Sequence, residues 1–456
     1  MIDFSKIKKV YIIGIKGSGI VGIAEILKLM QIEVLGSDTH EKFFTDEILQ
    51  KNKIIYFESF SVNNIPTDVD LVLYSTAYNV ENNVEFQEAI NRNIPMMSYP
   101  EILAQLFNQK YGVAVCGTHG KTTTSSMLAF ILDKAGISPT AVIGSRVKQW
   151  GGNAIVGTGE VFVIEADEYQ NKLALYTPHG AILTSVDYDH PDFFRNVEEY
   201  EKVFMDFVAK IPRIGFLVVW GDSATTNKVA CSCQGNIIKY GFMADNDIVV
   251  SKSKENLKRF NLKFGEEDWG EFETQLVGDH NLLNAAAVIA TCYKLNVDME
   301  KVRQALKEFQ GTSRRFEMIG ERNGAILIDD YGHHPEEIKT TLKATRELYP
   351  EKNLIAVFHP HSYSRTEALL QDFAQSFADA DKVIVLDIYG SARENSGKVS
   401  SKDLVDLINK YSRDKAEHIP TIDAVVESLQ DTIGGKDVVL AIGAGNVFEV
   451  VHKLKQ

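Results

Sequence analysis

Short apolar runs recur along the whole chain, and most of them end in glycine or in polar residues. Longer segments with apolar residues at helical spacing, such as residues 20–30, lie between many of these runs. Short apolar runs in this setting are typical of buried parallel strands that are joined by helices. We therefore predict an α/β protein with parallel sheets and with strands at residues 10–13, 33–36, 71–74, 94–97, 113–116, 161–164, 181–184, 325–328, 354–358, 383–386 and 438–442.

These elements fall into three segments along the 456-residue chain. A chain of this length usually folds as about two to four domains, each with its own core. We expect a Rossmann-like domain at residues 1–108, a central P-loop domain at residues 109–311 and a second Rossmann-like domain at residues 312–456.

Residues 113–127, VAVCGTHGKTTTSSM, combine a strand, a turn bracketed by glycines and the start of a helix. Backbone N–H groups in such a turn converge on phosphate oxygens, and the helix N-terminus adds positive potential. The lysine can reach the terminal phosphates, and the hydroxyl that follows it can ligate magnesium. Val115 stands where the full GxxxxGK[ST] pattern has its first glycine. The stretch predicts a nucleoside triphosphate site formed by Gly117, Thr118, His119, Gly120, Lys121, Thr122 and Thr123.

The first segment carries a second glycine loop between the strand at 10–13 and the helix at 20–30. Its glycines are spaced G-x-x-G-x-G, and Asp38 follows the loop by about 19 residues, where it would meet a ribose hydroxyl. Lys16 replaces a usual glycine, either beside a diphosphate or as a solvated lysine in a turn. We expect a site for NAD or a nucleotide sugar, built from Gly14, Lys16, Gly17, Ser18, Gly19, Ser37, Asp38 and Ser75.

Groups that can bind metal follow two strands of the central segment. Glu165 ends the strand at 161–164, and His190 follows the strand at 181–184. The carboxyl ends of parallel strands share one edge of a sheet, so these groups should meet the phosphate loop. Magnesium prefers oxygen ligands, and manganese also tolerates histidine. We predict a metal site of Thr122, Glu165 and His190, with solvated strand ends as the alternative.

Further candidates lie at one helix start and in the third segment. Asn281 and Asn284 open an alanine-rich helix and share one of its faces, where their amides could read a purine edge; simple helix capping is the alternative. Residues 311–316 form a hinge-like stretch that carries Arg315. The next strand ends in DDYGHHP and the one after it in HPHSYSRT, which supply Tyr331, His333, His361 and Arg365.

The amino-acid composition limits the kinds of molecule that the protein is expected to bind. The formal net charge of −14 disfavours nucleic acid and anionic membranes as partners. No window is long and apolar enough to span a bilayer, and the N-terminus runs directly into a strand, so we expect a cytoplasmic protein. Its four cysteines are too few and too scattered for a disulfide framework or a zinc site.

Taken together in their order, these motifs resemble the Mur ligases of peptidoglycan synthesis, most closely the UDP-N-acetylmuramate:L-alanine ligases of that family. The resemblance covers essentially the whole chain and rests on the two glycine loops together with EADEY at 165–169, DYDHPDFF at 187–194, GDHNLLN at 278–284, GTSRRF at 311–316, DDYGHHP at 329–335, HPHSYSRT at 359–366 and DIYGSARE at 387–394. It implies an ATP-dependent ligase that joins L-alanine to the lactyl carboxylate of UDP-N-acetylmuramate through an acyl phosphate.

The resemblance also implies residue roles. Lys121 would hold the β- and γ-phosphates, and Arg315 would meet them from the hinge. Metal ions, magnesium or manganese, would be held by Thr122, Glu165 and His190. The adenine and the rest of the nucleotide would lie by Asn281, Asn284, Tyr331 and His333, and the amino acid and the muramate carboxylate by His361 and Arg365.

Three positions depart from the family pattern. Lys16 replaces a loop glycine, Ser185 replaces an asparagine and Ser362 replaces an arginine. The last change removes one bidentate donor from the site proposed for carboxylates. Three alternatives stay open: a recycling ligase that adds a preformed tripeptide, an NAD-dependent dehydrogenase, and a non-catalytic regulator that binds a UDP-sugar. We expect a monomer or a homodimer.

Overall fold

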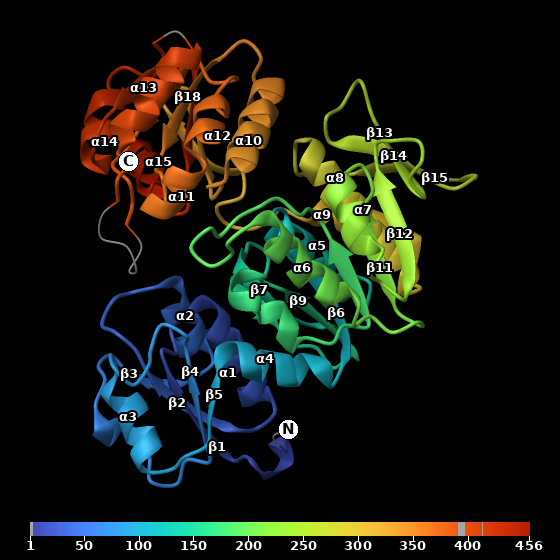
Figure 1. Ribbon diagram of the computed structural model, residues 1–456, viewed down its shortest axis with the longest axis vertical. Coiled ribbons are helices and arrows are strands. Elements are labelled where there is room, and N and C mark those ends of the chain that lie inside the picture. Colours follow the sequence, from blue (N-terminus) through green and yellow to red (C-terminus); the bar gives the residue numbers. More distant parts are fainter. Residues whose placement is uncertain (1–2, 391–396, 413) are drawn as a thin grey trace. The chain divides into compact units, whose positions relative to one another are not determined.

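The structure is a computed structural model that describes residues 3–390, 397–412 and 414–456. The α/β prediction is confirmed, because the strands form three sheets in which parallel pairs dominate (Figure 1). The chain divides into two compact units. Unit 1 holds residues 1–185, 202–249 and 285–310, and unit 2 holds residues 186–201, 250–284 and 311–456.

The first sheet lies in unit 1 and has the order β3-β2-β1-β4-β5, with every pair parallel. The order reverses between β1 and β4, and ligands of open α/β sheets bind at such a point. The 3-10 helices η1 (Phe4–Lys6) and η2 (Val62–Asn64) complete this segment. Its strands are β1 Lys9–Ile13, β2 Glu33–Ser37, β3 Ile55–Phe57, β4 Leu71–Tyr74 and β5 Met96–Ser98, and its helices are α1 Ser18–Leu29, α2 Phe44–Lys51, α3 Val84–Asn91 and α4 Tyr99–Asn108.

The second sheet runs in the order β13-β12-β11-β10-β6-β9-β7-β8; these strands belong to unit 1, except that residues 250–252 of β13 belong to unit 2. All of these pairs are parallel except β7–β8, which is an antiparallel hairpin. The strands are β6 Tyr111–Cys116, β7 Thr140–Val147, β8 Gly152–Ile155, β9 Val161–Glu165, β10 Gly180–Leu183, β11 Phe216–Trp220, β12 Asn236–Gly241 and β13 Ile248–Lys252. The helices of this segment are α5 Lys121–Lys134, η3 Tyr169–Leu175, α6 Val197–Val208, α7 Ala224–Ala230, α8 Asp279–Lys294 and α9 Met299–Glu308.

Helix α5 is buried on all sides: every residue from 122 to 132 is buried. It packs against the strands β6, β7 and β9, and helix α9 also packs against it. Because α5 is covered on all sides, it has no polar side that faces water, and its hydroxyl residues at 122–126 are buried. The first turn of α5 is thereby held firmly at the carboxyl end of β6.

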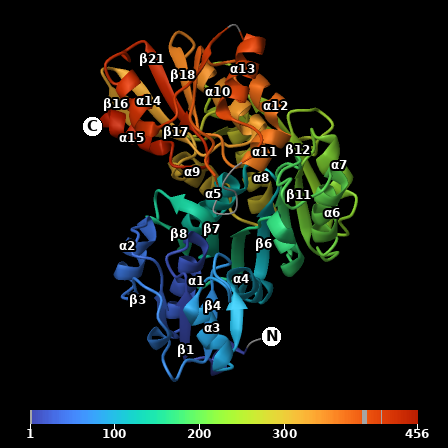
Figure 2. The ribbon, with the colours of Figure 1, turned by 60° about the vertical axis from the view of Figure 1, so that its left-hand side comes forward.

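Unit 2 contains the third sheet, in the order β16-β17-β21-β18-β19-β20, with only β16 antiparallel to its neighbour. Helices α10, α12 and α13 bury one face and α14 and α15 the other (Figure 2). The strands are β16 Glu317–Arg322, β17 Ala325–Asp330, β18 Asn353–Phe358, β19 Lys382–Val385, β20 Ala416–His418 and β21 Asp437–Ile442. The helices are α10 Pro335–Leu348, α11 Tyr363–Ala368, α12 Leu370–Gln375, α13 Ser401–Ser412, α14 Ile422–Leu429 and α15 Phe448–Lys455; unit 2 also holds the hairpin β14 Arg259–Phe264 and β15 Glu267–Glu273.

Two expectations about cysteines and membranes can be compared with the structure. All four cysteines lie within the described ranges and are free thiols, as the sequence predicts. Among the helices that the structure describes, none combines the length and the apolar character needed to cross a bilayer. Residues 391–394 of the DIYGSARE motif lie outside the described residues.

Candidate active site

The predicted phosphate loop lies between β6 and α5. Gly117 has φ +131°, and a Cβ atom there would come within 2.3 Å of the Thr184 hydroxyl, so only glycine fits this turn. Ser185, which replaces the family's asparagine, holds the same loop. Its carbonyl accepts from the Thr118 N–H at 3.0 Å, and its hydroxyl accepts from the His119 N–H at 3.0 Å. The loop is therefore fixed to the end of β10 before any phosphate arrives.

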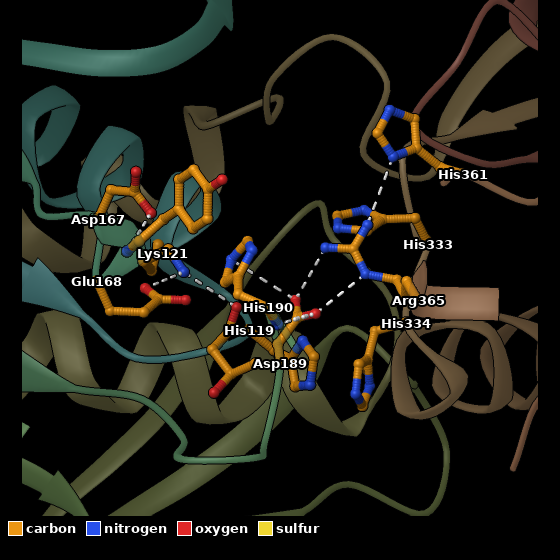
Figure 3. A network of polar contacts seen from close by, with 12 residues as sticks. His119, Lys121, Asp167, Glu168, Asp189, His190, His333, His334, His361 and Arg365 are labelled. Carbon is orange, nitrogen blue, oxygen red and sulfur yellow. Dashed lines mark hydrogen bonds and ion pairs between the residues drawn. The ribbon is translucent and has the colours of Figure 1, made fainter. Parts of the chain in front are cut away.

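Lys121 is the first residue of α5, and its ammonium group is fully engaged within unit 1. Nζ lies 2.9 Å from Glu168 Oε2 and 3.1 Å from the Thr118 carbonyl, and it also donates to the Gly117 carbonyl (Figure 3). Burial alone would lower the pKa of Lys121, but Glu168 and Asp167 raise it above its ordinary value. The lysine is thus a fixed positive charge at the phosphate loop. Glu168 is a partner that we did not single out from the sequence.

Thr122 and Glu165 form the second pair at this loop. The Thr122 hydroxyl donates to Glu165 Oε1 at 2.7 Å, and the Gly144 N–H donates to Glu165 Oε2 at 2.7 Å. A hydroxyl and a carboxylate that meet at this distance offer two hard oxygen ligands, which suits magnesium. These two residues fit the predicted metal. His190 belongs to unit 2, so its place in the metal site stays a prediction.

The glycine loop of the first segment is also held by its own side chains. Asp38 accepts the Lys16 N–H at 2.7 Å and the Tyr78 hydroxyl at 3.2 Å, while the Gly14 N–H donates to the Ser37 carbonyl at 2.8 Å. The Ser37 hydroxyl donates to the buried Glu85. The acid that we expected at a ribose hydroxyl therefore fixes the loop backbone as well, and its ribose role stays a prediction.

Lys16 does not behave as a solvated lysine, and that alternative is wrong. The residue is only 2% exposed. Its Nζ lies 3.1 Å from Asp46 Oδ1 and 3.4 Å from Glu58 Oε1, and it donates to the carbonyls of Thr39 and Glu41. These groups use the ammonium protons inside the protein. Lys16 therefore ties the glycine loop to the segment that leads into α2.

In unit 2, Arg365 and Asp189 form a buried ion pair with two hydrogen bonds. Arg365 Nε lies 3.0 Å from Asp189 Oδ1, and Nη2 lies 3.3 Å from Oδ2 (Figure 3). Burial would raise the pKa of Asp189, but the guanidinium outweighs burial and holds the pKa well below its usual range. His361 Nδ1 lies 3.5 Å from Arg365 Nη1, and burial lowers the pKa of the nearby His333 to about 3. The pair thus lies among imidazoles, of which His333 is neutral.

Ser362, which replaces an arginine of the family motif, has a structural role at the start of α11. It is the N-cap residue with φ +66°, and its hydroxyl accepts the Arg365 N–H at 3.3 Å. A serine hydroxyl at this position satisfies a helix N–H that would otherwise lack a partner. The change therefore supports the backbone of Arg365 while it removes a second guanidinium.

The two arginines of the hinge-like stretch have different partners. Arg314 binds inside unit 2, with Nε 3.1 Å from Asp329 Oδ2 and Nη2 2.7 Å from the Gly443 carbonyl. Arg315 instead lies over the Tyr331 ring at 5.2 Å and 3.7 Å from Glu337. Burial raises the pKa of Asp329 to about 7, although Arg314 acts in the opposite direction. Arg314 thus fixes this stretch to the third sheet, and the phosphate contact predicted for Arg315 stays a prediction.

Asn281 and Asn284 both lie inside the first turns of α8 and are buried in unit 2. The Asn281 amide donates to the Val277 carbonyl at 2.7 Å, and Asn284 Nδ2 lies 3.4 Å from Asn281 Oδ1. The two amides share one face, as the spacing predicts. Their role in reading adenine stays a prediction.

Comparison with known proteins adds independent evidence. Family models match three consecutive stretches: the Mur ligase family catalytic domain at residues 9–111, the Mur ligase middle domain at 115–292 and the Mur ligase glutamate ligase domain at 314–445. The UDP-N-acetylmuramate–L-alanine ligase of Caldanaerobacter subterraneus subsp. tengcongensis is 40% identical over 456 residues, with 99% of this chain and 98% of that protein covered. The chain belongs to the Mur ligase family.

Solved structures agree with this assignment. The UDP-N-acetylmuramate–alanine ligase of Thermotoga maritima is 25% identical and superposes with a TM-score of 0.81, with 98% of both chains covered. The murein peptide ligase of Psychrobacter arcticus is 22% identical with a TM-score of 0.74 over 98% of both chains, a likeness that shows the fold alone. As a Mur ligase, the protein is an ATP-dependent ligase.

The structure brings some of the predicted site residues of this Mur ligase together and adds others. Thr122 meets Glu165 in unit 1, and His361 meets Arg365 in unit 2. Glu168, Asp189 and Glu337 were not among our candidates, although each binds one of them. Glu168 and Asp189 lie inside the motifs EADEY and DYDHPDFF, and both follow strand ends at the sheet edge where we expected acids near Lys121; these are the sequence signals that could have indicated them.

Proposed function

We propose that this Mur ligase joins L-alanine to the lactyl carboxylate of UDP-N-acetylmuramate, with cleavage of ATP to ADP and phosphate. The observation that carries the proposal is the 40% identity to a UDP-N-acetylmuramate–L-alanine ligase across 99% of this chain. The phosphate loop supports the proposal, because Lys121 and Thr122 are the first two residues of the buried helix α5.

Each substrate has a proposed domain. Residues 1–108 would bind the UDP-sugar at the glycine loop, residues 109–311 would bind ATP, and residues 312–456 would bind the amino acid. The described contacts support this division, because each segment contributes its own sheet with polar groups at the strand ends. We expect the enzyme to act in the cytoplasm as a monomer or a homodimer.

In the first step, an oxygen of the lactyl carboxylate attacks the γ-phosphorus of ATP. The bond between that phosphorus and the bridging oxygen breaks, and an acyl phosphate and ADP form. Two anions must meet, so positive charge around the transferred phosphoryl group is the main requirement. Lys121 would exchange Glu168 and the loop carbonyls for phosphate oxygens, and Arg315 would add a second cation. Bound magnesium, or manganese, would supply further positive charge from a site formed by Thr122, Glu165 and His190.

In the second step, the free amine of L-alanine attacks the acyl carbon, and the tetrahedral intermediate expels phosphate. Arg365 would hold a substrate carboxylate, for which it must share or release Asp189. His361 and His190 are the groups that we propose to take the proton of the amine. Orientation of bound reactants contributes on the order of 7–11 kcal/mol in favourable cases, and exclusion of water protects the acyl phosphate from hydrolysis.

Release of phosphate from ATP tests the choice of substrate. The purified enzyme is mixed with ATP, magnesium and UDP-N-acetylmuramate, and L-alanine, glycine, L-serine or the recycled tripeptide is added in separate reactions. We expect fastest release with L-alanine and a product heavier by one alanine residue in mass spectrometry. Coupling to the tripeptide alone would identify a recycling ligase, and binding of ATP without any turnover would identify a regulator.

A further inference from the structure

Asn153 in β8 joins two parts of unit 1 that are far apart in the sequence. Its side chain is fully buried, with 0% exposure. The amide nitrogen donates to the Ser18 carbonyl, 135 residues away, and to the Ile143 carbonyl at 3.1 Å. Ser18 is the first residue of α1 and lies in the glycine loop that we assign to the UDP-sugar. The Asn153 amide therefore ties that loop to the β7–β8 hairpin.

The hydrogen bonds continue from the hairpin to the phosphate loop. Gly144, the residue after Ile143, donates its N–H to Glu165 Oε2 at 2.7 Å. The other oxygen of that carboxylate, Oε1, accepts the Thr122 hydroxyl at 2.7 Å. One path of backbone and side-chain hydrogen bonds thus runs from Ser18 through Asn153 to Thr122.

The path combines a close approach at the exposed Gly144 with a buried amide at Asn153. A Cβ atom at Gly144 would come within 2.8 Å of Glu165 Oε2, so the glycine permits the close approach of the carboxylate. Among the described residues, Asn153 Oδ1 has no hydrogen-bond partner although it is buried. Burial of an unpaired polar atom is unfavourable, so the side chain is held there by its two donor contacts. A tightly packed element of this kind can transmit a displacement.

We propose that Asn153 is a positioning residue that couples the UDP-sugar site to the ATP site. The inference rests on the proposed function, since it takes the loop at 14–19 as the sugar-nucleotide site and the loop at 117–123 as the ATP site. A UDP-sugar bound at the glycine loop would contact the first turn of α1, where Ser18 lies, and Thr122 and Glu165 would hold magnesium with ATP. By linkage, each ligand then changes the affinity for the other by the same factor.

Calorimetry measures that factor directly. The dissociation constant of UDP-N-acetylmuramate is determined with and without a saturating non-hydrolysable ATP analogue and magnesium, so that no turnover occurs. For the unmodified enzyme we expect the two constants to differ by at least about fivefold. For Asn153→Ala we expect the ratio to fall to about one. Gly144→Ala keeps the backbone N–H but adds a Cβ atom that would displace the Glu165 carboxylate, so it disturbs the next link of the path and should have the same effect.

Asn227→Ala is the matched control. The Asn227 amide also donates to two backbone carbonyls in unit 1, those of Gly221 and Ser223, and its Oδ1 likewise lacks a hydrogen-bond partner within the described residues. A change in this variant therefore reports the general cost of losing a partly buried amide. We expect its affinity ratio to equal that of the unmodified enzyme.

The outcomes separate this inference from the proposed function. Circular dichroism melting confirms that each variant is folded, and Gly144→Ala provides the test if Asn153→Ala does not fold. A ratio that stays unchanged in folded Asn153→Ala and Gly144→Ala overturns the coupling role and leaves the proposed function intact. An affinity ratio of one in the unmodified enzyme, when both ligands bind, also overturns the coupling role and leaves the proposed function intact. Failure of the unmodified enzyme to bind either ligand overturns both proposals.

Discussion

The guanidinium of Arg365 and the carboxylate of Asp189 form a buried pair in unit 2, with Nε 3.0 Å from Oδ1 and Nη2 3.3 Å from Oδ2. The two side chains are 9% and 7% exposed. A planar guanidinium that faces a carboxylate with two hydrogen bonds has a fixed orientation. Asp189 thus fixes the orientation of Arg365, and in the proposed mechanism it would compete with the substrate carboxylate for the guanidinium.

Removal of Arg365 should destabilise the enzyme and abolish ligation. Arg365→Ala leaves the carboxylate of Asp189 buried without a counter-charge, which typically costs about 3–5 kcal/mol of the free energy of unfolding. Urea unfolding measures this cost. The control is Arg259→Ala, which removes a guanidinium that is 44% exposed and pairs with Glu271 and Glu273; exposed pairs contribute about 0–1 kcal/mol. Equal stability losses in the two variants would contradict the role of burial at Asp189.

Lys121→Ala should abolish turnover while the affinity for UDP-N-acetylmuramate stays nearly intact. The lysine faces the phosphate loop, and loss of one preorganised charge at a developing anion typically lowers kcat by about 10²–10³-fold. Phosphate release gives the rate, and calorimetry gives the affinity. Lys134→Ala, on the last turn of the same helix with half of its side chain exposed, is the control. Ligase activity in Lys121→Ala near that of Lys134→Ala would rule out the phosphate role.

Lys16→Met should weaken the fold of the first segment. The ammonium lies against Asp46, which is 8% exposed, and its loss leaves that carboxylate without its cation, at a cost of about 3–5 kcal/mol. Lys42→Met is the control, because Lys42 pairs with the same Glu58 but is 67% exposed. Thermal melting should show a much larger decrease for the first variant. If the two variants melt at the same temperature, Lys16 does not stabilise the loop through Asp46.

Asp329 should make stability depend on pH. Burial raises the pKa of Asp329 to about 7 from its ordinary value of 3.8, so near neutral pH the native state holds a proton that the unfolded chain has already lost. The contribution of this carboxyl to stability is fully present below about pH 4 and is lost as the pH rises to about 7. At about 1.4 kcal/mol per pKa unit, the loss is about 4 kcal/mol.

Asp329→Asn isolates that effect. The amide does not titrate, so the difference in free energy of unfolding between the variant and the unmodified enzyme should shift in favour of the variant from pH 4 to pH 7. Urea unfolding at several pH values measures the difference. A constant difference across this range would show that Asp329 is ionised in the native state throughout, as its partner Arg314 favours.

The features that follow from local sequence were predictable, and those that depend on distant partners were not. Strand, glycine turn and helix around Lys121 lie within one short stretch, so their pattern indicated the phosphate loop directly. Asp189 lies 176 residues from Arg365, and no local pattern connects them. Lys16 shows the same limit, since its main partner, Asp46, becomes a neighbour only when α2 folds back beside the glycine loop.

The hairpin β7–β8 is the clearest example of an element that the apolar pattern did not indicate. Strand β8 is only four residues long, GNAI, and has a glycine and an asparagine in place of an apolar run. Burial of Asn153 is favourable there only because its amide meets the carbonyls of Ser18 and Ile143. From the sequence alone, a polar residue of this kind is assigned to a loop, because its distant hydrogen-bond partners are not known.

Transfer of an oxygen atom from the substrate to phosphate tests the proposed chemistry most directly. UDP-N-acetylmuramate labelled with ¹⁸O in its lactyl carboxylate is incubated with the enzyme, ATP, magnesium and L-alanine, and the released phosphate is analysed by mass spectrometry. An acyl phosphate requires that one carboxylate oxygen leaves with the phosphoryl group, so phosphate should carry one ¹⁸O atom for each amide bond formed. Unlabelled phosphate alongside amide product would show that the carboxylate does not attack the γ-phosphorus, and the proposed mechanism would be wrong.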